Sequence, residues 1–489
     1  MGSERIKTSA LLVQSFSAFA IAYITSLTGF IYAWPSYTVE MFQSNETVLS
    51  APMSSMEISL LGSLTNVGGL LATPFCGYAV NRFGRKYSAM LYGLPYVISW
   101  SLISITRWPP LVIAAVCLGG FGAAGQAVSS VYIGEICQDS IRGGLASTTV
   151  SGYFAGLLFS YIIGGQLTYY QVTYVHLAMS ILYLIMLMFL KESPVYLIQI
   201  GKEKEAAESL AFYRRVPAKS KEVEVEIRKI KMQMDPRIDQ ILQGENDPAM
   251  EELMDTKEIK IQENESQWKF LMKSESSKRA LLCVLIVMSL TILMGSIVLQ
   301  VYAEPLFKEA VPSMQPNLSS ILLAVTYISA SVICAFVVDK FGRKSLMTIT
   351  SIGSAVCNLL LGFQLHLHWG PHWCTAVIIY TYSFIYNLGA AIVPFVLTAE
   401  VFLPEVRGLG NSLSMACMWI MNFVTLIVFN PLVELLGLGP VFYGFSGICL
   451  IGAAYSHFCL PETKGLSVDA IQLLFLKKNQ VKDNKSSIK

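Results

Sequence analysis

The fold of this chain is decided by a short basic box that occurs twice, as NRFGRK (Asn81–Lys86) and as DKFGRK (Asp339–Lys344). Each box is followed at a distance by a glutamate and, seven residues after that, by an Arg-Gly pair: Glu135 with Arg142, and Glu400 with Arg407. All of these elements lie at the edges of long apolar stretches. One such match would carry little information, but two copies with the same companion indicate an internally duplicated membrane protein. Duplication of this kind is typical of transporters.

Composition supports a membrane protein. The 489 residues are 54% hydrophobic and 14% charged, and their mean hydropathy is +0.53. Windows of about 20 apolar residues predict twelve spans, six on each side of a polar interval. They lie near residues 11–33, 58–80, 88–106, 111–133, 145–166, 173–190, 280–303, 319–338, 346–366, 374–397, 409–431 and 440–459. The first span lacks a small-residue cleavage site, so it is interpreted as a retained helix rather than a signal peptide. The expected fold class is an all-α integral membrane protein.

The basic residues set the expected orientation. With the N-terminus inside, only Arg107 and Lys308 of the 35 Lys and Arg fall in predicted outside loops, as the positive-inside rule requires. The sequons at Asn45 and Asn317 also fall in outside loops, so both are candidate glycosylation sites. The sequons at Asn264 and Asn484 fall inside and are expected to stay unmodified.

Several function classes have no support in the sequence. The ten cysteines lie in or beside the spans without a CxxC pair, which is typical of reduced packing residues. We expect no metal and no cofactor, with a metal site at the outside histidines His366, His368 and His372 as a minor alternative. There is no nucleotide-binding loop and no nucleophile motif, so we do not expect an enzyme. The Gly-rich run 119–125 lies within a span and indicates close helix packing.

The polar interval 192–277 carries nearly balanced charge, which argues against a nucleic-acid partner. It is either a solvated linker or a set of short helices beneath the membrane domain. Apolar residues recur there at helical spacing between breaks at Pro236 and Pro248, which favours the helices.

The repeated charges predict ion pairs at the inside face. An arginine fork can bind a carboxylate bidentately, and the glycine of each box permits a tight turn between two spans. Pairs that form and break as the inside ends approach and separate would bias a two-state equilibrium. The alternative is that the charges only obey the positive-inside rule, but the duplicated glutamates favour a conformational latch. The candidate latch residues are Arg82, Arg85, Glu135, Arg142, Glu192, Asp339, Arg343, Glu400 and Arg407.

With these boxes in place, the chain resembles the sugar-porter branch of the major facilitator superfamily, especially animal facilitative hexose transporters and insect trehalose-transporter-like proteins. The matching segments are GYAVNRFGRK (77–86), VYIGEICQDSIRGG (131–144), KESPVYL (191–197), FVVDKFGRK (336–344), AEVFLPEVRGLGNS (399–412) and PETKGLSVDAI (461–471). The resemblance implies a major facilitator fold of 12 transmembrane helices that alternates access around a central site. The implied domains are a six-helix bundle at 1–191, a cytoplasmic helical subdomain at 192–277, a second bundle at 278–459 and a cytoplasmic tail at 460–489. It also implies a plasma-membrane location with both termini cytoplasmic.

The pocket is where the chain departs from that family. Relatives usually carry Gln-Gln-x-Ser-Gly-x-Asn in the seventh helix, whereas only the glycine is retained here. The corresponding residues are Thr291, Ile292, Met294, Gly295 and Ile297. Tyrosines take the usual glutamine position of the fifth helix and the asparagine position of the eighth, and a phenylalanine replaces the tryptophan of the tenth. The candidate substrate-binding residues are Tyr161, Thr291, Gln300, Tyr302, Tyr327, Asn387, Phe395, Trp419 and Asn422.

The expected function is facilitative transport of a sugar, either a hexose or trehalose. Ile31 falls where proton-coupled relatives carry an acid, so downhill uniport is expected. Loss of pocket amides weakens selection for hydroxyl-rich ligands, so transport of a polyol or another small organic solute stays open. A poorly transporting sugar sensor is the other alternative. The expected partners are the small-molecule substrate and the lipid bilayer, with no obligate protein partner.

Overall fold

The computed structural model describes residues 7–138, 141, 145, 148–233, 267–402, 406–464, 466, 471 and 474–475. The spans of the first half are α1 (Thr8–Gln43), α2 (Ser55–Phe83), α3 (Arg85–Ile105), α4 (Pro109–Ala123) with α5 (Gln126–Ile136), α7 (Thr148–Gln166) and α8 (Tyr169–Met188). Short helices follow as α9 (Pro194–Gln199), α10 (Glu203–Arg214), α11 (Lys221–Gln233) and α14 (Gln267–Lys273). The second half contains α15 (Glu275–Leu293), α16 (Ser296–Val301), α17 (Ala303–Ala310), α18 (Pro316–Phe341), α19 (Arg343–Leu367), α20 (His372–Leu388), α21 (Val393–Glu400), α22 (Arg407–Leu436) and α23 (Leu438–Phe458).

Eleven helices in the described residues are long and apolar enough to cross a membrane. The prediction of twelve spans differs from this number by α7. This helix occupies the fifth position in the series, but its Thr, Ser, Tyr and Gly residues lower its hydropathy. Those residues have contacts within the protein: Gly152 and Gly156 lie close against α1, whereas Tyr153 and Tyr161 bond to Gln300 of the other half.

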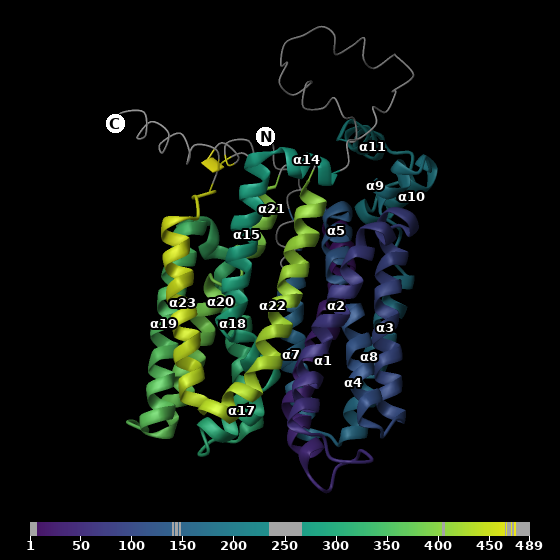
Figure 1. Cartoon of the computed structure of the whole chain (residues 1–489). Helices are drawn as coiled ribbons and strands as arrows, with labels where there is room; N and C mark the ends of the chain where they lie inside the picture. Colours follow the sequence, from purple (N-terminus) through teal and green to yellow (C-terminus); the bar gives the residue numbers. More distant parts are fainter. Residues whose placement is uncertain are drawn as a thin grey trace, which may run out of the picture.

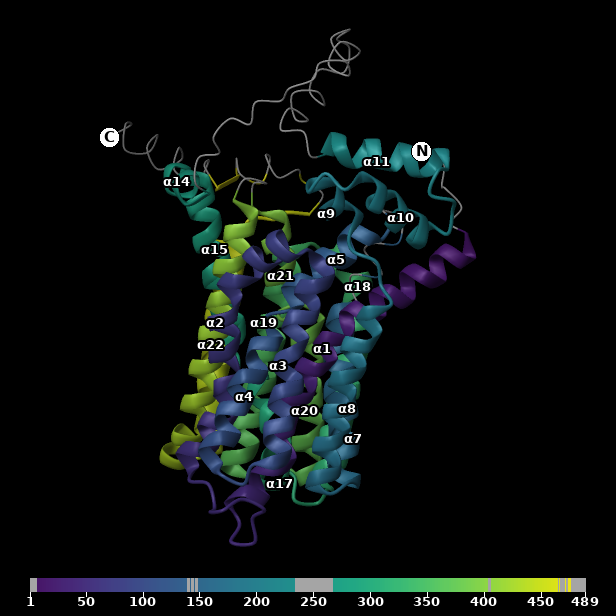
Figure 2. The same cartoon turned by 90° about the vertical axis from the view of Figure 1, so that its right-hand side faces the viewer.

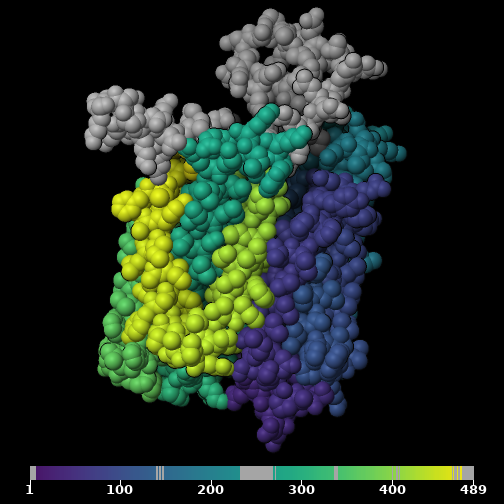
Figure 3. Space-filling view, in the orientation of Figure 1, coloured from purple at the N-terminus to yellow at the C-terminus, as the bar shows by residue number. Residues whose placement is uncertain are grey.

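The helices form two groups that stand side by side. Helices α1 to α8 pack mainly on one another, as do α15 to α23, and the two groups meet along α2 with α22 and along α7 with α18 (Figure 1). The space-filling view shows α22 in contact with the first group along the lower part of the molecule (Figure 3). This arrangement puts any residue between the two groups in a position that relative movement of the halves would change.

The short helices lie at one end of the bundle. Helices α9, α10 and α11 sit beyond the ends of the spans, close to the beginning of α1 (Figure 2). Arg214 fastens them there, since its guanidinium donates to the carbonyl of Ile136 at 2.7 Å and pairs with Glu226. The prediction of short helices is therefore confirmed for the described part of the interval, whereas Pro236 and Pro248 lie outside it. We call this end the linker face and the opposite end the far face.

Two spans of the second half are broken near the middle of the bundle, the seventh between α15 and α16 and the tenth between α20 and α21. The seventh is interrupted at Gly295, whose φ of 93° is in the left-handed region that favours glycine. Tyr382 and Tyr386 of α20 donate to the carbonyls of Met294 and Thr291 at 2.7 and 3.0 Å. These bonds satisfy backbone groups that the break releases, which lipid could not do. Discontinuous spans of this kind mark binding sites in transporters.

The Gly-rich run 119–125 packs tightly, as predicted. A Cβ added at Gly120 would lie 1.9 Å from the carbonyl oxygen of Thr65 on α2. The two backbones therefore touch through a position that only hydrogen can occupy.

Candidate functional site

The contact between the two halves centres on Gln300, in the short helix α16. Tyr153 of α7 donates its hydroxyl to the side-chain oxygen of Gln300 at 2.7 Å. Tyr161, farther along α7, donates to the backbone carbonyl of the same residue. Because α7 and α16 belong to different halves, both hydrogen bonds join the halves next to the break in the seventh span. In this buried setting such bonds are stronger than in water.

Tyr327 of α18 stands beside this centre. Its ring stacks on Phe154 of α7 with centroids 5.2 Å apart. Its hydroxyl faces the side chains of Ser296, Gln300 and Ser383, yet it has no hydrogen-bond partner of good geometry among the described residues. The hydroxyls of Ser296 and Ser383 are likewise buried and unpaired within the described chain. Buried hydroxyls without partners are costly, and the hydroxyl groups of a ligand would satisfy them.

The first half contributes a second polar pair. Tyr32 of α1 donates to the side-chain oxygen of Asn66 on α2 at 2.6 Å, and its ring lies edge-on to that of Tyr153, with centroids 6.1 Å apart. Sequence analysis missed Tyr32, Asn66 and Tyr153. The signal available was weak, because it consisted of polar groups within apolar spans, and many other tyrosines in the chain share that property.

The remaining predicted site residues lie in the second half and on its contact surface. Thr291 bonds to the carbonyl of Ala390 at 3.3 Å, and Asn387 donates to the carbonyl of Ser383 at 2.9 Å. Trp419 reaches across to the first half, where its indole N–H donates to the Thr73 hydroxyl at 3.0 Å. The other three are buried Asn422, whose carbonyl oxygen is unpaired within the described chain, buried Tyr302, and Phe395, which is 39% exposed. Contact with substrate stays a prediction for all nine candidates.

The halves are joined again at the far face. Asn430 of α22 donates to the Ser59 hydroxyl of α2 at 3.1 Å. Lys308 of α17 pairs with Glu40 of α1, and Asn317 of α18 donates to the carbonyl of Tyr161 at 2.8 Å. Six of the seven interhalf hydrogen bonds identified in the described chain lie at the middle of the bundle or toward this face, and the seventh, between Trp419 and Thr73, lies somewhat nearer the linker face. The structure is therefore closed at the far face.

The first basic box forms a compact cluster at the linker face. Arg85 pairs with Glu135 at 2.7 Å, and both side chains are largely buried. Ser193 donates its hydroxyl to the same glutamate. The carboxylate of Glu192 accepts the backbone N–H of Arg85 at 2.8 Å; burial raises the pKa of Glu192, while these N–H bonds act in the opposite direction. Gly84 has φ 87° and no room for a Cβ, which would lie 2.4 Å from the Glu192 carboxylate.

The second box repeats the cluster. Arg343 pairs with Glu400 at 2.7 Å, and Thr463 donates its hydroxyl to Glu400 at 2.7 Å. Glu462 accepts the backbone N–H of Arg343 at 2.8 Å. Sequence analysis missed Ser193, Glu462 and Thr463. A signal was present, because each copy has a glutamate followed directly by a hydroxyl residue.

These clusters bear on the predicted latch. Arg85 with Glu135, and Arg343 with Glu400, each form a pair within one half rather than between halves. Arg82 is exposed at the end of α2, and its carbonyl accepts the hydroxyl of Tyr196 at 3.1 Å. Arg142, together with the side chains of Asp339 and Arg407, lies outside the described part of the structure. The latch stays a prediction, and it requires these charges to exchange partners when the linker-face ends approach.

The two sequons differ in their surroundings. Asn45 is exposed in the turn between α1 and α2. Asn317 is inside α18, and its amide nitrogen donates both to the carbonyl of Tyr161 and to the carboxylate of Glu304. Glycosylation of Asn317 stays a prediction, and in this structure the nitrogen that would be modified is engaged between the two halves.

Comparison with known proteins agrees with this architecture. The family model described as "Sugar (and other) transporter" matches residues 10–475. The chain belongs to this family. The facilitated trehalose transporter Tret1 of Polypedilum vanderplanki is 24% identical over 473 residues, covering 94% of this chain and 88% of that protein. Tret1 of Bombyx mori is 25% identical, covering 95% and 87%, whereas the match to Tret1 of Aedes aegypti covers only 54% of that longer protein.

Solved structures match over almost the same length. The inward open conformation of the xylose transporter XylE from E. coli superposes with a TM-score of 0.73 at 19% identity, covering 95% of this chain and 98% of XylE. The XylE proton:xylose symporter bound to 6-bromo-6-deoxy-D-glucose gives 0.66 at 19% identity, with 96% and 98% covered. These structural similarities show that the chain has the major facilitator fold.

Proposed function

We propose that this chain is a facilitative sugar carrier that moves a hexose or trehalose down its concentration gradient by alternating access. The family match supports this proposal, and so does one structural observation above all. Buried hydroxyls of Tyr327, Ser296 and Ser383 lie unpaired, within the described chain, beside the Tyr153–Gln300 contact between the halves. A hydroxyl-rich solute bound there would touch both halves and satisfy these groups.

The conformational cycle follows from where the interhalf bonds lie. With the far face closed, a substrate at the centre leaves toward the linker face. Opening at the far face requires the interhalf bonds of Gln300, Asn317, Lys308 and Asn430 to break together, while the linker-face ends approach. We propose that the two box clusters then act as the latch, with arginines or glutamates of one half pairing with those of the other. Charge pairs that exchange partners in this way bias the equilibrium without binding substrate.

Uniport is favoured because an apolar residue of the first span takes the place of an acid found in proton-coupled relatives. Ile31 is fully buried in α1 at the position where coupled relatives carry an acid. A proton-driven carrier needs an ionisable group near its substrate site. The central groups described above are hydroxyls and amides, which do not change charge near neutral pH.

Uptake of labelled glucose and of labelled trehalose into proteoliposomes tests the proposal, with labelled myo-inositol as a polyol probe. We expect saturable uptake of one sugar that reaches the external concentration and no higher, even when a pH gradient is imposed. Accumulation above that level would reject uniport. Uptake of inositol alone would establish the polyol alternative. Binding of a sugar without uptake of any probe would favour a sensor.

Tyr153→Phe tests the site itself. The variant loses one hydroxyl that bonds to Gln300, a contribution of about 1 kcal/mol, so we expect KM to change about fivefold in either direction with surface expression intact. Tyr78→Phe is the matched control, because Tyr78 is 64% exposed on the outside of α2 and should transport like the parent. Equal kinetics of both variants and the parent would place the substrate elsewhere.

The remaining assignments rest on the family and the charge pattern. We propose two six-helix domains, residues 1–191 and 278–459, joined by the interval 192–277 and followed by a tail at 460–489. We also propose a plasma-membrane location with the linker face cytoplasmic, so that the far face is extracellular. The substrate and the lipid bilayer are the proposed partners, with no enzymatic activity and no obligate protein partner.

A further inference from the structure

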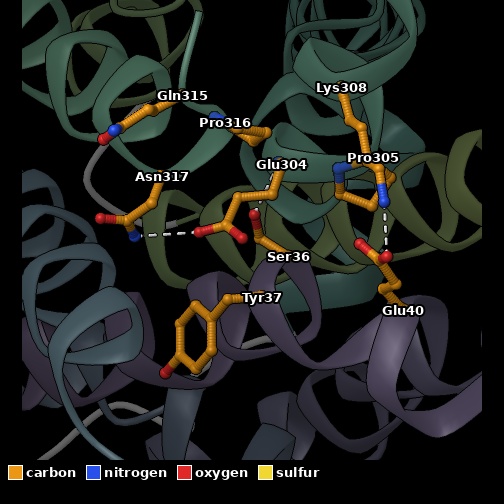
Figure 4. Close-up of a pocket in the computed structure, with 9 residues that line it drawn as sticks. All are labelled: Ser36, Tyr37, Glu40, Glu304, Pro305, Lys308, Gln315, Pro316 and Asn317. Atoms are coloured by element: carbon orange, nitrogen blue, oxygen red, sulfur yellow. Dashed lines mark hydrogen bonds and ion pairs between the residues drawn. The ribbon is translucent and has the colours of Figure 1, made fainter. Parts of the chain in front are cut away.

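A cavity of about 200 Å³ opens at the far face where α1, α17 and α18 meet. Its polar residues pair with one another, twice across the two halves and once within the second half (Figure 4). Lys308 pairs with Glu40, the backbone N–H of Glu304 donates to the Ser36 hydroxyl at 2.9 Å, and Asn317 donates to the Glu304 carboxylate at 3.0 Å. Because these groups bond to one another, the residues around the cavity hold the two halves together rather than leaving polar groups free to bind a ligand.

Glu304 differs from Glu40, the other acid that lines this cavity. Glu40 is largely exposed and has Lys308 as its counter-ion. Glu304 is half-buried, and the one side-chain bond identified for its carboxylate comes from the neutral amide of Asn317. Burying a carboxylate without a cation is costly, and the cost disappears when the acid is protonated.

We propose that Glu304 is a proton-binding site that links external pH to opening of the far face. The inference rests on the proposed function for its orientation and for the opening movement. When Glu304 is protonated, the form closed at the far face is stabilised. When Glu304 is ionised, separation of α17 from α1 is favoured, because separation returns the carboxylate to water.

The neighbouring Glu40 carboxylate acts in the same sense as burial. The titratable side chains nearest Glu304 are Glu40 and Tyr37 on α1, Lys308 on α17 and Tyr161 on α7, and the Tyr161 hydroxyl is bonded to the Gln300 carbonyl. Burial raises the pKa of Glu304 and the nearby Glu40 carboxylate raises it further, while the Asn317 hydrogen bond lowers it. Lys308 is engaged by Glu40, and Tyr37 turns its hydroxyl toward Ser160 at 2.9 Å.

The direction of the pH effect follows from this raised pKa. The closed form binds the proton more tightly than the open form, in which an exposed Glu304 has its ordinary pKa. At pH values between the ordinary pKa of Glu304 and its raised pKa, opening therefore releases a proton. Below both values the ratio of open to closed molecules is constant and low. It rises with pH through this window by about tenfold for each unit that separates the two pKa values.

Electron spin–spin distances between the halves test the proposal on the full chain in nanodiscs. Glu46 and Ser313 are exposed in far-face loops of the first and second halves. Labels attached there through an encoded ketone residue leave the ten native cysteines untouched. Between about pH 4.5 and about pH 8, we expect the long-distance population of the parent to increase with pH.

Two variants and one control decide the outcome. Glu304→Gln should hold the short distance at all pH values, because it imitates the protonated acid. Asn317→Leu should move the transition to higher pH, because it removes the bond that lowers the pKa of Glu304. Glu309→Gln removes the same charge from an exposed position on the same helix and should titrate like the parent.

A parent distance that ignores pH would overturn the proposal, and so would a pH response that survives in Glu304→Gln. These distances do not depend on transport. Loss of the pH response with intact sugar uptake therefore rejects the gate alone, whereas a pH response without uptake of any probe rejects the proposed carrier function alone.

Discussion

Gly62→Ala should shift the carrier toward the form that is open at the far face. Gly62 lies on α2 opposite Tyr302, and an added Cβ would sit 2.5 Å from the tyrosine hydroxyl oxygen and 3.1 Å from Val301. Ordinary contact begins at 3.4 Å, so the surfaces must separate by about 0.9 Å (3.4 minus 2.5). Tyr302 has little freedom to yield, since it is 3% exposed and stacks on Phe429.

The size of the shift follows from where the strain is felt. Overpacking costs about 1–3 kcal/mol, and here it acts only in the closed form, because α2 and Tyr302 belong to different halves. The open-to-closed ratio should therefore rise by roughly 5- to 150-fold. The distance between labels at Glu46 and Ser313 measures this population directly.

Gly77→Ala is the matched control on the same helix, because a Cβ there has no neighbour within 4 Å. It should leave the distance distribution of the parent unchanged. Unaltered distances in Gly62→Ala, in a sample with normal thermal stability, would refute the reasoning that this contact belongs to a closure that opens.

Three further predictions concern other parts of the molecule. Arg85→Ala leaves the buried Glu135 carboxylate without its cation, so the free energy of unfolding of the detergent-solubilised protein should fall by about 3–5 kcal/mol. Removal of the sequon by Asn45→Gln should abolish the mobility shift produced by a glycosidase, whereas Asn317→Gln should leave that shift unchanged, because Asn317 is engaged between the halves. Arg214→Ala removes charge-assisted bonds worth about 1.5–3 kcal/mol each, so hydrogen exchange in α10 should accelerate at least tenfold.

Each of these has a result that would contradict it. Unchanged unfolding of Arg85→Ala, measured beside the exposed-pair control Glu205→Gln, would show that the box cluster contributes nothing to stability. A glycosidase shift that survives in Asn45→Gln would move the glycan to another sequon. Exchange in α10 that matches that of Lys204→Ala, an exposed change on the same helix, would mean that Arg214 does not fasten the linker helices.

The sequence alone determined the class of the protein. Apolar windows, the asymmetry of Lys and Arg and the duplicated boxes are local patterns, and they predicted the membrane helices and the short linker helices that the structure contains. They also placed the arginines and glutamates of the boxes at one face, because chain position brings these groups there, but the individual pairs, Arg85 with Glu135 and Arg343 with Glu400, came from the structure. The spacing of the motifs in the sequence did not predict the role of Glu462, because that role depends on the return of the chain after α23 to the turn at Gly342.

Only the tertiary structure decided what happens between the halves. Asn317 matches a glycosylation sequon, but its amide joins Tyr161 to Glu304, and no local pattern reveals a contact between distant segments. Tyr153 and Gln300 form the central contact for the same reason. Helix periodicity and hydropathy indicate whether a side chain is buried in protein or lipid. They do not register which half faces it, and that depends on how two separately packed bundles meet.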